Sequence, residues 1–122
     1  LNQEREPYIQ EDPIVGLIRG YMELQVPENW SSMSLNERME WRMNVELGFT
    51  PAGGARLDTI CALQVWCEVL GRRIGDHTSR DIANIHRVLR QIPGWTLSPR
   101  PGVSAAYGEQ ATFVRIDEPE LI

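Results

Sequence analysis

The chain has 122 residues, an ordinary hydrophobic fraction of 42% and a formal net charge of -5. This length predicts one domain with a core of its own, and the apolar fraction excludes wholesale disorder. The longest apolar runs are only a few residues long, which excludes a membrane span and a secretory leader.

Residues 1–33 are predicted to form an acidic lead-in with a helical arm. The pair Asp12-Pro13 is typical of a helix N-cap followed by proline at the first helical position. Apolar residues then recur at helical spacing, which predicts a helix from 13 to about 24. We expect the folded domain at 34–117 and an acidic tail at 118–122.

The predicted domain begins with a capping box made by Ser34 and Glu37, which indicates a helix that runs to about residue 44. A loop rich in glycine and proline follows, and then a short strand at 55–59. The next helix, at 63–70, is apolar around half of its circumference or more. We therefore expect that helix at the centre of the core.

A second capping-box pattern, Thr78 to Asp81, predicts a helix at 79–91 that a Pro-Gly pair ends. The rest of the domain is predicted to be a strand, an extended hairpin loop and a second strand, at 95–97, 98–110 and 111–116.

The order helix-strand-helix-helix-strand-strand predicts an α+β fold, mainly α, of the winged helix-turn-helix type, with the N-terminal helical arm added. Proteins of that type place the second helix of the helical pair in the major groove of DNA. Here that helix is 79–91, and the hairpin at 98–110 is the predicted wing.

The 79–91 helix has an apolar side and an opposite side with residue types that can contact DNA bases. Ile82, Ile85 and Leu89 fall within one narrow sector of the helix. The opposite side carries arginine, which pairs with guanine, and the amides that pair with adenine. The predicted base-contacting residues are Arg80, Asn84, Arg87 and Gln91. The predicted phosphate contacts are Arg72, Arg73 and Arg100.

Charge is distributed unevenly along the chain. Residues 1–50 contain four arginines against nine acidic residues, whereas residues 51–116 contain eight arginines against five. A mildly basic unit thus follows an acidic lead-in, which the net charge of the whole chain conceals, and the lead-in would repel phosphate. All basic residues are arginine, and a chain without lysine contains no Walker A loop.

The two cysteines, Cys61 and Cys67, point to different sides of a helix and are expected to be reduced, buried thiols of a cytoplasmic protein. With His77 and His86 they do not have the spacing of a zinc site. There is no nucleophile motif, and the adjacent carboxylates lie in the terminal segments. We expect no catalytic residue, metal or cofactor in this chain.

Most of residues 11–116 also carry a pattern of tryptophan, glycine and aliphatic positions. The segments are EDPIVGLIRGYM, VPENWSSMSLNERMEW, RLDTIC, VWCEVLG, DIANIHRVLRQIPGW and YGEQATFVR. They resemble the C-terminal region of the virulence-associated protein E family, which are large primase-helicase-like proteins of phages, prophages and mobile islands. The resemblance implies a role in phage or prophage DNA replication, as part of a parent protein whose ATPase and helicase core lies outside this chain. Because the chain begins with Leu1, we expect it to be a piece of a longer protein.

DNA is therefore the predicted partner. The alternative is a protein-interaction or oligomerisation module that docks on the parent ATPase or on a replication partner. Its surface would be the first helix, through Ile14, Leu17, Ile18 and Tyr21. A structural lid on the ATPase core, without a ligand of its own, is a third possibility.

Overall fold

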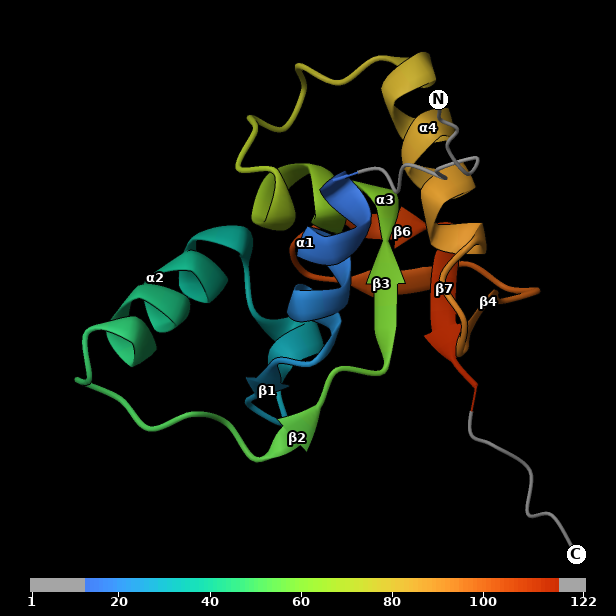
Figure 1. Cartoon of the computed structure of the whole chain (residues 1–122). Helices are drawn as coiled ribbons and strands as arrows, with labels where there is room; N and C mark the ends of the chain where they lie inside the picture. Colours follow the sequence, from blue (N-terminus) through green and yellow to red (C-terminus); the bar gives the residue numbers. More distant parts are fainter. Residues whose placement is uncertain (1–12, 117–122) are drawn as a thin grey trace, which may run out of the picture.

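The structure is a computed structural model that describes residues 13–116 as an α+β fold (Figure 1). The lead-in to residue 12, with the predicted N-cap Asp12, and the tail 118–122 lie outside the described residues. The helices are α1 (Pro13–Met22), α2 (Leu35–Glu46), α3 (Ala62–Gln64) and α4 (Ser79–Arg90). A 3-10 turn, η1 (Trp30–Ser32), precedes α2, and a π-helical turn, η2 (Val65–Val69), continues α3.

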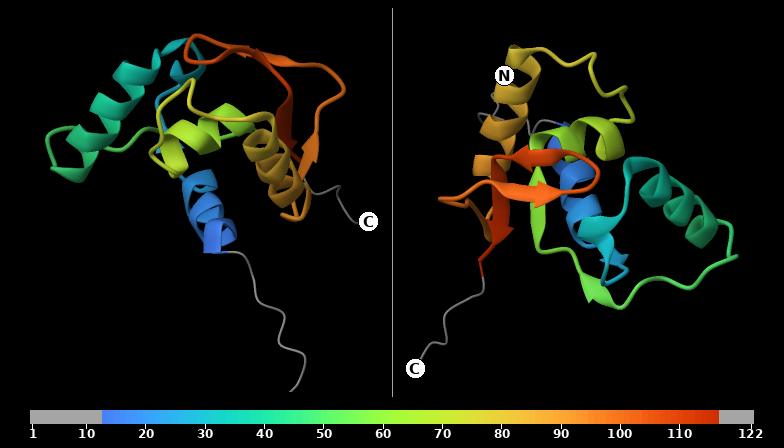
Figure 2. Two further views of the ribbon diagram at one scale, coloured as in Figure 1. Left: turned by 90° about the horizontal axis from the view of Figure 1, so that it is seen from above. Right: turned by 180° about the vertical axis from the view of Figure 1, so that it is seen from behind.

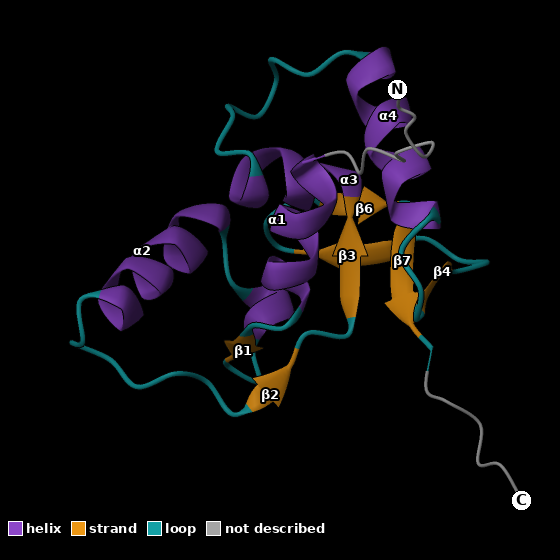
Figure 3. Cartoon of the chain, in the orientation of Figure 1, coloured by secondary structure: helices purple, strands orange, loops and turns teal. Residues whose placement is uncertain are grey.

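The strands within 13–116 form three small antiparallel sheets (Figure 3). The central sheet has the order β3-β7-β4, and these strands are Thr59–Cys61, Thr112–Arg115 and Trp95–Leu97. Phe113 of β7 faces Ile60 on one side and Leu97 on the other. The two remaining pairs are β1 (Gln25–Val26) with β2 (Ala55–Arg56), and β5 (Gly102–Ser104) with β6 (Gly108–Gln110).

The helices predicted from periodicity are confirmed with shifts of one or two residues at most of their ends. The helix at 79–91 is α4, which ends at Arg90, and the strand at 95–97 is β4. The prediction of one strand at 55–59 is wrong, because β2 and β3 are separate strands in different sheets. Between them lies buried Leu57, whose carbonyl oxygen accepts a hydrogen bond of 2.7 Å from the Arg115 guanidinium.

The first helix is part of the core and not an arm beside it. Val15, Ile18, Tyr21 and Met22 are all buried, in the same hydrophobic cluster as the centre of the α3–η2 segment. Its apolar residues recur at spacings of three and four, so one side of α1 is apolar and packs on η2. The predicted division into an arm at 1–33 and a domain from 34 is corrected accordingly for the residues that are described.

The segment expected to form an open wing folds back over the molecule. Its two strands, β5 and β6, lead away from α4 towards η1, as Figure 2 shows. At the tip, the backbone N–H of Ala105 donates a hydrogen bond of 2.9 Å to the carbonyl of Ser31. Tyr107 follows the tip and is buried. The prediction of a wing that extends over 98–110 is therefore corrected, because its tip bonds to η1.

Candidate nucleic-acid interface

Helix α4 is held at its start by a capping box and along one side by the core. The N–H of Asp81 donates to Thr78 Oγ1 at 3.1 Å, and the N–H of Thr78 donates to Asp81 Oδ2 at 2.8 Å. Ile85, Val88 and Leu89 are buried, with Leu89 fully enclosed. The helix is thus fixed by apolar burial, which is the usual anchor of an amphipathic helix.

The opposite side of α4 is open to solvent. The four residues predicted to contact bases, Arg80, Asn84, Arg87 and Gln91, are all exposed, and so are Ala83 and Arg90. Among residues 13–116, the guanidinium groups of Arg80 and Arg87 form no ion pair or hydrogen bond. Their N–H donors are therefore available to a ligand.

The charge around α4 is positive. Residues 71–91 contain five arginines and two aspartates, a formal charge of +3 in a chain of net charge -5. The backbone and hydroxyl of Thr78 lower the pKa of Asp81, which keeps this carboxylate charged and offsets one arginine. His86 adds no charge at neutral pH, because partial burial and then Arg90 lower its pKa. Its ring lies 5.7 Å from that of Phe113.

The three predicted phosphate-contacting arginines lie outside α4. The guanidinium of Arg72 lies 5.4 Å from the centre of the Trp66 ring, in the turn between η2 and α4. Arg73 lines a groove against α2, and its carbonyl accepts a hydrogen bond of 2.8 Å from the indole of Trp66. Arg100 is exposed in the loop that follows β4.

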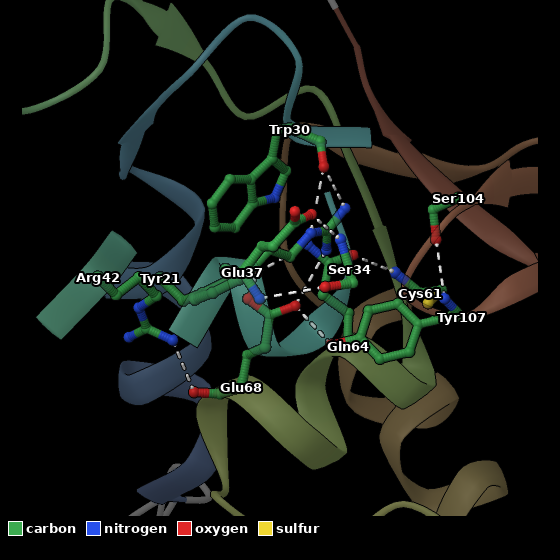
Figure 4. A network of polar contacts seen from close by, with 11 residues as sticks. Tyr21, Trp30, Ser34, Glu37, Arg42, Cys61, Gln64, Glu68, Ser104 and Tyr107 are labelled. Atoms are coloured by element: carbon green, nitrogen blue, oxygen red, sulfur yellow. Dashed lines mark hydrogen bonds and ion pairs between the residues drawn. The ribbon is translucent and has the colours of Figure 1, made fainter. Parts of the chain in front are cut away.

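A buried carboxylate, Glu68 of η2, is the polar centre that sequence reasoning missed (Figure 4). Its side chain is fully buried and accepts three hydrogen bonds. Tyr21 donates to Oε1 at 2.7 Å, while Arg38 at 3.0 Å and Tyr107 at 2.5 Å donate to Oε2. The carboxylate therefore joins α1, α2 and the hairpin β5–β6 to η2.

Arg38 completes this network from α2. Its Nε and Nη2 donate to the carbonyl of Trp30 at 3.2 and 2.8 Å, and its guanidinium lies 4.6 Å from the Trp30 ring. Gln64 donates to the hydroxyl of Tyr21 at 2.7 Å. With a cation and two hydroxyls on it, Glu68 is stabilised as a structural anion, because a buried charge is tolerated when it is paired and hydrogen-bonded.

A signal for this network was present in the sequence. Gln64 and Glu68 are four residues apart on a segment that is otherwise apolar, and they form its one polar side. Both side chains are buried. Partners for them come from residues 21, 38 and 107, which no local pattern connects with 64 or 68.

The two cysteines are free and buried. Burial raises the pKa of both thiols, and burial together with Glu68 raises the pKa of Cys67 to about 11. Over residues 13–116, no three histidine, cysteine or acidic side chains gather closely enough to bind a metal ion. No helix in that range is long and apolar enough to cross a membrane.

Comparison with protein-family models finds no family that matches the chain. A search of curated proteins likewise finds no match.

Proposed function

We propose that this chain is a winged-helix DNA-binding domain that reads duplex DNA with the exposed face of α4. The single observation that carries the proposal is the row of unpaired Arg80 and Arg87, with Asn84 and Gln91, on a helix whose other side is buried in the core. A rigid helix that presents arginine and amide side chains has the chemistry of a major-groove reader.

The order of the central sheet supports the winged-helix proposal. In this sheet β3 and β4 both pair with β7, which comes last in the chain. The helices α3 and α4 lie between β3 and β4 in sequence. That arrangement sets α4 against the sheet and turns its polar side outward. The proposal gives DNA contact to α4, Arg72 and the Arg100 loop, and it omits the hairpin tip that bonds to η1.

The resemblance to the virulence-associated protein E family adds a proposed setting, which is phage-type DNA replication beside a helicase or ATPase core. In that setting the domain would engage origin or fork duplex while the core acts elsewhere. Phosphate contacts from Arg72, Arg90 and Arg100 would add affinity that does not depend on sequence.

Fluorescence anisotropy with duplex and single-stranded DNA tests the proposal, at about 50 and about 200 mM salt. We expect micromolar binding to duplex that weakens with salt. The double variant Arg80→Ala/Arg87→Ala should lose most of this affinity, because each base-reading arginine is worth about 1–3 kcal/mol. Arg19→Ala, an exposed arginine of α1, is the matched control and should bind as the parent chain does. Unchanged affinity in a folded double variant would overturn the proposal.

A protein-interaction function is the second candidate, but not through the surface predicted for it. Ile18 and Tyr21 of α1 are buried, and Leu17, at 57% exposed, is the large exposed apolar residue of that helix. Deleting residues 1–25 would remove part of the core, so it would not test an interface. The exposed apolar face that favours an interaction lies on α2.

A further inference from the structure

Helix α2 carries a stripe of apolar residues on the side that faces away from the core. Met39, Met43 and Leu47 are 41%, 60% and 59% exposed, and Phe49, just beyond the helix, is 76% exposed. The spacing of four residues aligns Met39, Met43 and Leu47 along one face, and it continues to Leu35, which is partly buried against the core. Figure 1 shows α2 at the periphery of the molecule, with this length of helix free of neighbouring elements on its outer side.

This face is apolar although the opposite side of α2 already packs against the rest of the molecule. The side of α2 that faces the molecule contains Arg38, Trp41 and Val45, and its fully buried residue is Arg38. The exposed side chains Met39, Met43 and Leu47 are therefore surplus to what holds the helix in place. A contiguous apolar patch on a soluble domain marks an interaction site more often than single exposed residues do.

The two ends of the stripe carry opposite charges. At the N-terminal end, Leu35 and Met39 line one side of a groove of about 320 Å³, and Arg72, Arg73 and Ile74 line the other. At the C-terminal end, Glu46 lies on the same side of the helix as Leu35 and Met39. The surface is thus basic at one end, apolar along the middle and acidic at the other end.

We infer that this stripe binds a second copy of the chain, with the two α2 helices antiparallel around a two-fold axis. An axis midway between Met39 and Met43 sets Met39 against Met43 of the second copy and Leu35 against its Leu47. The same axis brings Glu46 of each copy to the groove that contains Arg73 of the other. A two-fold interface uses the same patch twice. In the antiparallel arrangement the apolar residues of this patch meet one another, and its basic end meets the acidic end of the other copy.

Self-association places Arg73 at the dimer interface, which is consistent with its position in the groove that Leu35 and Met39 also line. The inference is independent of DNA binding, because it is tested in the absence of DNA. If the dimer forms and DNA does not bind, only the proposed function fails. If DNA binds to a monomer, only this inference fails.

Sedimentation velocity of the whole chain, from about 1 to several hundred micromolar, is the test. We expect a reversible dimer with a micromolar dissociation constant. Met43→Glu, at an exposed position, should raise that constant at least tenfold without changing the thermal midpoint. Val103→Glu, a 73% exposed position of β5, is the matched control and should leave the dimer intact.

A charge exchange distinguishes a second copy from any other arrangement. Glu46→Arg alone and Arg73→Glu alone should each weaken the dimer, because each sets like charges together across the axis. The double variant Glu46→Arg/Arg73→Glu should restore it. A chain that stays monomeric up to several hundred micromolar, a dimer that Met43→Glu leaves unchanged, or a double variant weaker than both single variants would overturn the inference.

Discussion

Helices α2 and α4 begin in the same way and are held in different ways. Each is twelve residues long, and each starts with a complete capping box, Ser34 with Glu37 and Thr78 with Asp81. Helix α4 then buries three aliphatic side chains, whereas the fully buried residue of α2 is the cation Arg38. Helix α4 is anchored by buried aliphatic side chains. Helix α2 is anchored by an ion pair and hydrogen bonds to Glu68 and Trp30, with Leu35 and Trp41 packed half-buried against the core.

This difference explains why the two helices present opposite surfaces. A helix anchored by its apolar side is left with a polar outer face, which in α4 is the face proposed to bind DNA. Helix α2 is anchored mainly by polar contacts and leaves Met39, Met43 and Leu47 outside, which is the face proposed to bind a second copy. The way in which each helix is anchored, and not the way in which it starts, sets which side chains it exposes.

Removing the carboxylate should break the α2 anchor most severely. Glu68→Ala leaves Arg38 buried without its ion pair and leaves the hydroxyls of Tyr21 and Tyr107 without their acceptor. We expect the free energy of unfolding to fall by about 3–5 kcal/mol, as for other broken buried pairs. Urea unfolding followed by tryptophan fluorescence measures this loss.

The double variant Arg38→Met/Glu68→Met is the control for that prediction. Because it removes both charges together and keeps volume, it should be clearly more stable than Glu68→Ala alone. If Glu68→Ala cost less than about 1 kcal/mol, the size of an exposed pair, the polar anchor would not be what holds α2.

Tyr107→Phe should have a smaller effect that depends on pH. Its hydroxyl bond to a charged acceptor contributes about 1.5–3 kcal/mol. Burial, and then Glu68, raises the pKa of Tyr107 above its ordinary value of 10.0. A raised pKa means that this stability is fully present below the unfolded-state pKa and is lost as the pH rises above it, by up to about 1.4 kcal/mol per pH unit.

Urea midpoints measured between about pH 8 and pH 11 test this sign. The parent chain should lose stability more steeply above pH 10 than Tyr107→Phe does. Cys61, Cys67 and Tyr21 also have raised pKa values and are common to both chains. The comparison therefore isolates Tyr107, and equal slopes would mean that its hydroxyl is not held by Glu68.

The capping boxes should give the smallest and most similar effects. Ser34→Ala and Thr78→Ala each remove one side-chain acceptor for a helix N–H, at 3.2 and 3.1 Å. Each should lower the free energy of unfolding by about 1 kcal/mol. Thermal unfolding of the two variants side by side measures it. A cost for one several times that of the other would show that the two helix starts are not equivalent.

The sequence predicted the α4 side of this comparison well and the α2 side poorly. The period of Ile85 and Leu89 identified the buried face of α4, and with it the exposed positions of Arg80 and Arg87. For α2 the sequence predicted the helix but not its anchor. Arg38 lies among charged and polar neighbours that are mostly exposed, so nothing local distinguishes it as the one that is buried.

The starts of α2 and α4 and the polar face of α4 could be predicted from the sequence, because capping and amphipathicity depend on residues within one short segment. The tertiary structure alone decided the burial of Glu68, the place of α1 in the core and the return of the hairpin to η1. Those features depend on pairs 30, 39 and 47 residues apart, namely Arg38, Tyr107 and Tyr21 with Glu68. A buried charge is stable only when such distant partners all contact it, and the periodicity of one segment does not predict those contacts.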